Sequence, residues 1–204
     1  MKSVIVSVTN DLSTDQRVDK VCHTLTDMGF RVLLVGRWLP GCLPVNERPY
    51  DTHRMKLIFR RGPFFYAEYN FRLLWFLLFH QCKLLVANDL DTLLANFIAH
   101  KLKKIPLIYD SHEFYTETPE LVNRPGVQHI WQRIEGFIFP KLGDIITVND
   151  SIARLYEKKY GKPVHVVRNI PRSRVSKLKT SRQELGLPND QWIVILQGAG
   201  LNIQ

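Results

Sequence analysis

The sequence predicts one large α/β domain in which a doubly wound parallel sheet is covered by helices on both faces. Two observations carry this prediction. Short apolar runs alternate many times with longer segments of helical periodicity. The runs, such as residues 4–8, contain almost no polar residues, which is typical of strands buried on both faces. Because a helical segment separates most successive runs, we expect the strands to be parallel.

The first unit shows the pattern most clearly. Residues 4–8 form an apolar run, and residues 15–28 repeat apolar side chains at intervals of three and four, as an amphipathic helix does. Gly29 follows where a helix C-terminal glycine is expected. The later strands are predicted at residues 31–35, 55–59, 84–87, 107–109, 144–148 and 164–167, and the later helices at 64–81, 92–102, 127–142 (bent near Pro140) and 151–160.

The composition changes after residue 171. We expect an N-terminal domain at residues 1–171 and a basic linker at 172–190, in which residues 182–188 read as a helix end and turn. Residues 192–196 read as a new strand, and glycines follow it. We therefore interpret residues 191–204 as the start of a second, truncated domain.

Charge and cysteine content narrow the classes of partner. The formal net charge of +9 favours anionic partners such as a phosphorylated ligand or an acidic lipid surface. The basic residues are scattered and no nucleic-acid-binding motif is present, so we expect no nucleic-acid partner. Cys22, Cys42 and Cys82 suggest neither a disulfide framework nor a metal site. Together with the lack of a signal-peptide pattern, this favours a cytoplasmic location.

Residues 60–79 raise the question of membrane contact. Arginines and aromatic residues precede a very apolar run that is too short to span a bilayer. One interpretation is a core helix with a solvated start. The other is an interfacial surface at the inner face of a membrane, near a lipid-linked acceptor.

Polar residues follow five of the predicted strands. In a parallel sheet, ligands bind beyond the carboxyl ends of the strands, where the strand order reverses. The candidate binding residues are Asn10, Asp11, Asp15 and Arg17 after the first strand, Asn88 and Asp89 after the strand at 84–87, Asn149 after 144–148, and Arg168 and Asn169 after 164–167.

Several of these residues have a structural alternative. Asp15, Asp91 and Asp150 or Ser151 are expected as helix N-caps, and Asn10 and Asp11 also suit a turn. The first strand is not followed by the glycine-rich dinucleotide fingerprint, and no Walker pattern is present. A nicotinamide enzyme is therefore not indicated.

His112 is the strongest candidate for chemistry. It follows the strand at 107–109 and stands between two carboxylates, Asp110 and Glu113. A neighbouring carboxylate can fix the imidazole tautomer and raise its pKa, which suits it to donate a hydrogen bond to a phosphate or hydroxyl. No other ligands cluster with it in the sequence, so we expect no metal. We predict His112, Asp110 and Glu113 as catalytic residues.

Four stretches together resemble the N-terminal domain of a family 4 glycosyltransferase, which has the GT-B architecture of two Rossmann-like domains. They are the loop and helix from "TNDLSTDQR", the element "YDSHEFYTE", the strand and helix "DIITVNDSIARLYEKKYG", and the turn "VHVVRNIP". The stretch "VILQGAGLNIQ" resembles the opening strand of the nucleotide-binding domain. The likeness covers nearly the whole chain.

The resemblance implies transfer of a sugar from a nucleotide diphosphate sugar to an acceptor, with retention of the anomeric configuration and without a metal or other cofactor. His112 would lie by the donor sugar, and the absent second domain would bind the nucleotide sugar. Two departures stand out: Asn10–Ser13 replaces the usual glycine pair after the first strand, and Asn169-Ile170 replaces the common Asn-Gly turn.

Two alternatives remain open. One is a non-catalytic Rossmann-like module that binds an anionic ligand or a partner protein through the same strand ends. The other is a complete small enzyme that uses His112 with Asp110 or Glu113.

Overall fold

The computed structural model describes residues 2–45, 47–170 and 180–194. The chain divides into two units, Met1–Asn169 and Ile170–Gln204. The first unit holds all the helices and strands of the described residues. In the second, the described residues form a turn closed by hydrogen bonds from Leu185 N to Ser181 O and from Gly186 N to Gln183 O.

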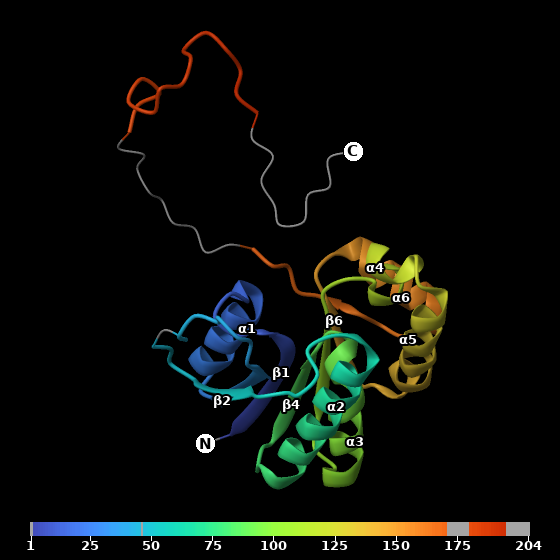
Figure 1. The fold of residues 1–204 in the computed structure, drawn as a ribbon. Coiled ribbons are helices and arrows are strands. Elements are labelled where there is room, and N and C mark those ends of the chain that lie inside the picture. The colour runs from blue at the N-terminus through green and yellow to red at the C-terminus, as the bar shows by residue number, and fades with distance from the viewer. Residues whose placement is uncertain (1, 46, 171–179, 195–204) are drawn as a thin grey trace. The chain divides into compact units, whose positions relative to one another are not determined.

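The first unit is built on one sheet of seven parallel strands in the order β3-β2-β1-β4-β5-β6-β7 (Figure 1). The order reverses between β1 and β4, which places the switch point of the doubly wound sheet between these two central strands. The strands are β1 (Ser3–Asp11), β2 (Arg31–Arg37), β3 (Asp51–Met55), β4 (Leu84–Asn88), β5 (Leu107–Ser111), β6 (Asp144–Thr147) and β7 (His165–Val166).

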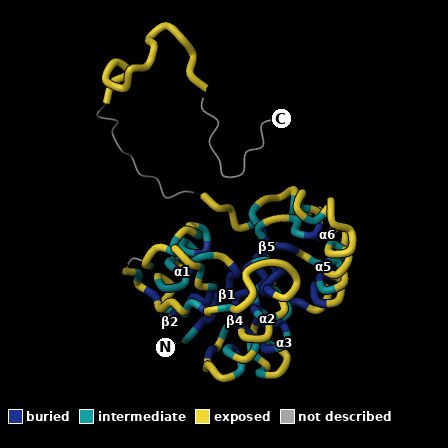
Figure 2. Tube along the Cα trace, viewed as in Figure 1, coloured by how far each residue is buried: buried dark blue, intermediate teal, exposed yellow. Residues whose placement is uncertain are grey.

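Helices cover both faces of the sheet, but unequally. On one face α1 (Gln16–Asp27) packs Val18 and Cys22 against the apolar side chains of β1 and β2. On the other face a larger core joins α2 (Gly62–Phe79), α3 (Leu90–Lys103), α5 (Pro125–Ile138) and α6 (Asp150–Tyr160) to the sheet. Figure 2 shows the buried strands between these outer layers. The predicted doubly wound α/β sheet is confirmed.

Local sequence signals fix the helix ends. Asp15 caps α1, because its Oδ1 accepts a hydrogen bond from Val18 N at 3.1 Å. Gly29 then ends this helical segment with φ at +83°, a left-handed conformation that favours glycine. The cap of α6 is Asn149, whose Oδ1 accepts from Ile152 N at 2.8 Å. The prediction of Asp150 or Ser151 as this cap was therefore one or two residues late.

Two element boundaries differ from expectation. β3 lies at Asp51–Met55, whereas residues 55–59 were predicted, because backbone pairing with β2 stabilises a polar segment at the sheet edge. The predicted helix at 127–142 ends at Ile138 and continues as a 3-10 turn, η2 (Phe139–Lys141), with Pro140 inside it. Proline has no N–H to continue the helical ladder.

Two short helical segments follow β5 in the chain. These are η1 (Tyr115–Glu117) and the short helix α4 (Pro119–Val122). The strand predicted at 192–196 is absent from residues 192–194, and residues 195 and 196 lie outside the described residues. Within the described ranges, no helix combines the length and apolarity that crossing a membrane requires.

Candidate functional site

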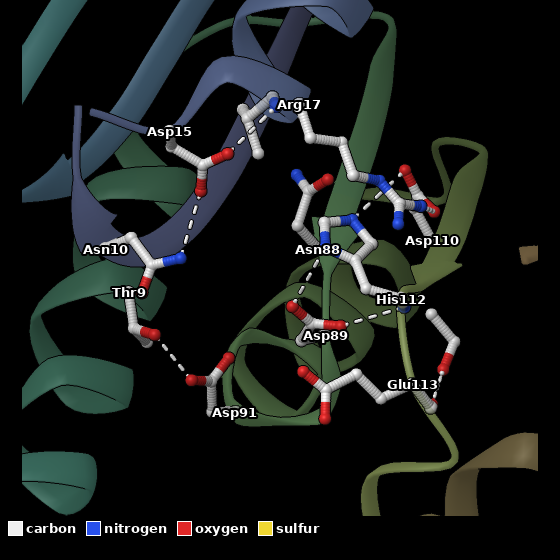
Figure 3. Close-up of polar contacts among 12 residues, drawn as sticks. Thr9, Asn10, Asp15, Arg17, Asn88, Asp89, Asp91, Asp110, His112 and Glu113 are labelled. Carbon is white, nitrogen blue, oxygen red and sulfur yellow. Dashed lines mark hydrogen bonds and ion pairs between the residues drawn. The ribbon is translucent and has the colours of Figure 1, made fainter. Parts of the chain in front are cut away.

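The carboxyl ends of β1, β4 and β5 bring a group of polar side chains together with the first turn of α1 (Figure 3). These strands are neighbours in the sheet and flank the switch point. The group consists of Thr9 and Asn10 from β1, Asp15 and Arg17 at the start of α1, Asn88, Asp89 and Asp91 around the end of β4, and Asp110, His112 and Glu113 at the end of β5. We call it the switch-point cluster.

An ion pair joins α1 to β5 in this cluster. Arg17 Nη2 lies 2.7 Å from Asp110 Oδ1. The Asp110 side chain is only 2% exposed and that of Arg17 is 14% exposed, so water screens the pair weakly. Since Asp110 belongs to β5 and Arg17 to the first turn of α1, the pair holds the start of α1 against the end of β5, beside the switch point.

His112 lies between two carboxylates. Its Nδ1 is 3.3 Å from Asp89 Oδ2, and its Nε2 is 3.5 Å from Asp110 Oδ2. Burial by itself would lower the pKa of His112, but contact with Asp110 and the negative charges of Asp89 and Asp110 outweigh it and raise this pKa above its ordinary value. The two carboxylates therefore stabilise the cationic form of the ring relative to an ordinary histidine.

The Nε2 atom of His112 is buried and has no hydrogen-bond partner among the residues that the structure describes. Its nearest charged neighbour is Asp110 Oδ2, which lies 3.5 Å away at ion-pair distance without hydrogen-bond geometry, so this N–H keeps its capacity to donate to a bound acceptor. The side chain as a whole keeps 15% exposure. A phosphate or hydroxyl oxygen has the matching acceptor chemistry.

The Asp89 side chain contacts both the ring and the backbone of His112, and its main chain bonds to β5. Its Oδ1 accepts a hydrogen bond from His112 N at 3.0 Å, and Asp89 N donates to Asp110 O at 2.9 Å. The residue stands at the N-cap position of α3, but its side chain caps no helix N–H. Its φ of +59° is uncommon for a residue other than glycine. Such conformations concentrate at functional sites because surrounding contacts must sustain them.

Asp91 is part of the cluster and was misassigned from the sequence. It lies in the first turn of α3, two residues beyond the cap residue Asp89, and is buried. Its Oδ2 accepts a hydrogen bond from Thr9 Oγ1 at 2.5 Å. Burial and the charge of Asp89 raise the pKa of Asp91 to about 7. An aspartate beside a helix start resembles an ordinary cap, and no local signal reveals its burial against β1.

Three more predicted residues line the cluster in different ways. Asn10 Nδ2 donates to Asp15 Oδ2 at 3.0 Å, so both residues are tied to the start of α1. Asn88 is fully buried and its Nδ2 donates to Ser7 O, which joins β4 to β1. Glu113 is exposed, and Figure 3 shows its side chain on the same side of the cluster as Asp89.

Asp11 does not join the cluster. Its Oδ1 lies 2.8 Å from Arg54 Nη2, an ion pair with β3 on the other side of β2. The same oxygen accepts a hydrogen bond from Ser13 N, as in an Asx turn. The turn alternative describes Asp11 better than the binding one.

The three predicted residues that follow β6 and β7 each have a partner outside the switch-point cluster. Asn149 caps α6, and Arg168 forms an exposed ion pair with Asp150 at 2.8 Å. Asn169 Oδ1 accepts a hydrogen bond from Lys20 Nζ at 2.9 Å, which connects the residues after β7 to α1. These contacts give each residue a structural role at the sheet edge.

A small pocket of about 30 Å³ lies between the end of β2 and the start of α2. Arg37, Trp38, Phe59, Arg60 and Phe65 line much of it. The Arg37 guanidinium stands 4.7 Å from the centre of the Phe65 ring, and its charge reaches Asp91, whose pKa it lowers. Arg37 and Trp38, a basic and an aromatic residue at the end of the second strand, were the sequence signal for this pocket.

No group of three or more His, Cys, Asp and Glu side chains is arranged to hold a metal ion in the described part of the chain. The basic side chains of the cluster are Arg17 and His112, and Arg37 lines the adjoining pocket.

The sequence model of glycosyltransferase family 4 matches residues 15–170. This range begins at the cap of α1 and ends just after Asn169, so it contains nearly all of the switch-point cluster. No protein of curated function matches the sequence.

Several solved structures share the fold. Sucrose-phosphate synthase from Thermosynechococcus elongatus superposes with a TM-score of 0.67 at 13% identity, over 93% of this chain and 54% of that one. HepE from Anabaena in complex with UDP-glucose gives 0.59 at 13% identity, over 91% and 50%. A UGT transferase from Siraitia grosvenorii in complex with UDP gives 0.53 at 10% identity, over 91% and 54%. The chain spans about half the length of each.

Proposed function

Because the chain belongs to glycosyltransferase family 4, we propose that it is the N-terminal, acceptor-side half of a retaining glycosyltransferase. The whole enzyme moves a sugar from a nucleotide diphosphate sugar to a polysaccharide, glycolipid or small-molecule acceptor. The observation that carries this proposal is the position of His112 at the switch point of the sheet, where it is held between Asp89 and Asp110 and its Nε2 makes no hydrogen bond to any described residue.

His112 is the proposed catalytic residue. With its pKa raised by the two carboxylates, the imidazolium donates a hydrogen bond from Nε2 to a donor-sugar hydroxyl or to the departing diphosphate. Such a bond gains strength as negative charge develops on the leaving group, so it stabilises the transition state more than the bound substrate. Asp110 and Asp89 act as positioning residues that fix the ring.

The other members of the cluster shape the cleft. Arg17 is the second cation at the mouth, and it also neutralises Asp110. Glu113 keeps an exposed carboxylate at this edge, available to an acceptor hydroxyl. The start of α1 adds backbone N–H groups that favour an anion. In this proposal basic groups and helix starts, with no metal, offset the charge of the diphosphate.

The donor is assigned to a second domain that follows the described residues. The proteins with similar structures are about twice as long as the matched part, and one is bound to UDP-glucose. We place the reaction in the cytoplasm, with the protein in peripheral contact with the anionic inner face of a membrane. The free cysteines Cys22, Cys42 and Cys82 agree with a reducing compartment.

A transfer assay on two proteins tests the proposal. A longer protein that contains this chain and the following domain is expected to release nucleotide diphosphate from a panel of UDP- and GDP-sugars when acceptor is supplied. The 204-residue chain alone is expected to release none and to bind nucleotide sugars weakly. Turnover by the chain alone would refute the assignment of the donor site to another domain, and a longer protein inactive on the whole panel would count against sugar transfer.

A further inference from the structure

Helix α2 is apolar on both of its faces. One face packs Phe65, Tyr69, Leu73 and Leu77 into the core of the domain. The opposite face carries Phe64, Phe71, Trp75 and Phe79, which are 67%, 67%, 60% and 68% exposed. At 3.6 residues per turn these four side chains lie within an arc of about 80°. We call them the α2 stripe.

Exposed aromatic side chains in a row are unusual on a soluble surface. Single exposed apolar residues are common, but a continuous apolar patch marks an interaction site. The stripe is a ridge, about 22 Å long from Phe64 to Phe79 at the helical rise. Trp75 and Phe79 contact each other as tilted rings with centres 4.8 Å apart, so the stripe is continuous at this end.

The charge around the stripe is strongly positive. Residues 52–88 contain six lysine or arginine residues and one acidic residue, Glu68. Arg54 pairs with Asp11 and Arg72 with Glu68, which leaves Lys56, Arg60, Arg61 and Lys83 without an ion pair among the described residues. Glu68 is already engaged, since its carboxylate accepts hydrogen bonds from Ile58 N, Phe59 N and Arg72 Nε. The field over this surface therefore attracts anions.

Two arginines stand where a helix least favours them. Arg60 and Arg61 are exposed at the start of α2, and the first turn has no acidic residue and no side-chain cap. Cations are unfavourable near a helix N-terminus because the macrodipole is positive there. Their position does not stabilise the helix, so an external anion gives them a better explanation.

We propose that the α2 stripe with Arg60 and Arg61 is a docking surface for an anionic lipid bilayer. Aromatic rings that enter the boundary between headgroups and acyl chains, with arginines at the phosphates, are the composition that interfacial binding requires. A convex ridge can enter a fluid bilayer, whereas a protein partner would need a matching groove.

The location of this surface has a consequence that rests on the proposed function. α2 connects β3 to β4, which are parallel, so its N-terminus lies at the same sheet edge as His112. The pocket lined by Arg37, Arg60 and Phe65 opens at that end of α2. A bilayer on the stripe brings lipid headgroups to this pocket, which favours an acceptor carried by a phosphate-bearing lipid.

Sedimentation of the 204-residue chain with vesicles tests the docking surface without any sugar transfer. We expect binding to vesicles of phosphatidylcholine and phosphatidylglycerol at 70:30 and at least tenfold weaker binding to phosphatidylcholine alone. The double variant Phe71→Ser/Trp75→Ser should bind the anionic vesicles at least tenfold more weakly. Arg60→Gln/Arg61→Gln should lose most of the preference for anionic lipid. Phe137→Ser, an equally exposed aromatic position (62%) on α5, is the matched control and should bind like the parent.

Tryptophan fluorescence supplies a second readout that does not depend on how well a serine variant folds. Brominated lipids should quench part of the emission of the parent chain, and Trp75→Phe should abolish most of that quenching while binding persists. The proposal is overturned if the parent ignores anionic vesicles, or if the stripe variant binds as the parent does. It is also overturned if the stripe instead joins two copies, so that Phe71→Ser/Trp75→Ser dissociates a dimer and vesicles have no effect.

Discussion

Arg17 and Asp110 stand 93 residues apart in the chain, yet their side chains meet at 2.7 Å across the switch point of the sheet. Asp110 is almost completely buried, and Arg17 is the basic group paired with it. The second oxygen of Asp110 faces His112 Nε2 at 3.5 Å. One buried carboxylate therefore links the start of α1 to the imidazole, and a change in either cation alters the other.

Replacing Arg17 tests how much this ion pair contributes to the free energy of unfolding. Arg17→Met leaves the Asp110 carboxylate buried beside His112 alone, and breaking a buried pair in this way costs roughly 3 kcal/mol of unfolding free energy. Urea denaturation measures the loss. Arg168→Gln is the matched control: its pair with Asp150 has a similar length, 2.8 Å against 2.7 Å, but the side chains are 66% and 55% exposed, so the loss should stay below about 1 kcal/mol. Equal losses in the two variants would contradict the burial argument.

The ionisation of His112 gives a second test. Because its folded pKa is raised, the stability that it contributes is complete below the ordinary value of 6.5 and is lost as pH rises through the folded pKa. NMR titration of the ring protons should show a pKa above 6.5, and Asp89→Asn should lower it by removing one of the two charges. A value at or below 6.5 in the parent protein would show that burial dominates.

Asp91 should impose a slope on stability against pH. In the unfolded chain its carboxyl group ionises near 3.8, whereas in the folded protein its pKa is about 7. Between these values the folded state binds the extra proton, so the unfolding free energy falls as pH rises from about 4 to 7, by on the order of 4 kcal/mol at most. Asp91→Asn should flatten the curve in this window. Thr9→Val removes a hydrogen bond that favours the carboxylate, so it should extend the slope to higher pH.

Gly36 packs closely against the end of β1, which carries Asn10. A Cβ atom at this position would stand 2.3 Å from Leu12 Cδ2 and 3.0 Å from the carbonyl oxygen of Asn10. Leu12 is fully buried and has little room to move, so Gly36→Ala should destabilise the fold by about 1–3 kcal/mol. Gly136→Ala, on the exposed side of α5 with nothing within 4 Å, should instead stabilise by up to about 1 kcal/mol. Thermal unfolding of the two variants would refute the steric argument if both moved in the same direction.

Most of the fold could be predicted because the residues that determine each strand and helix lie close together in the sequence. The apolar run before Thr9, the periodic helix after Asp15 and the glycine at position 29 each act within a few residues. The position of β3 was predicted wrongly because its sequence at Asp51–Met55 is polar. Pairing with β2, and not an apolar pattern, determines where this strand lies. An edge strand of this kind carries almost no periodic signal.

The site was predicted in part, for the same reason. Strand ends revealed Asp110, His112 and Asp89, since a parallel sheet brings such ends to one edge. The partner of each side chain depends on tertiary packing. Asp11 forms an ion pair with Arg54 on β3, and Asp91 accepts a hydrogen bond from Thr9 on β1. Neither contact can be predicted from the local sequence.

The turnover of a His112→Ala variant tests the central claim most directly, in a longer protein that contains this chain and the following domain. If the imidazolium acts mainly in the transition state, kcat and kcat/KM should both fall by well over tenfold while the protein stays folded. His129→Ala, at an exposed position on α5, should leave both unchanged. Kinetics of His112→Ala within twofold of the parent would remove His112 from the mechanism.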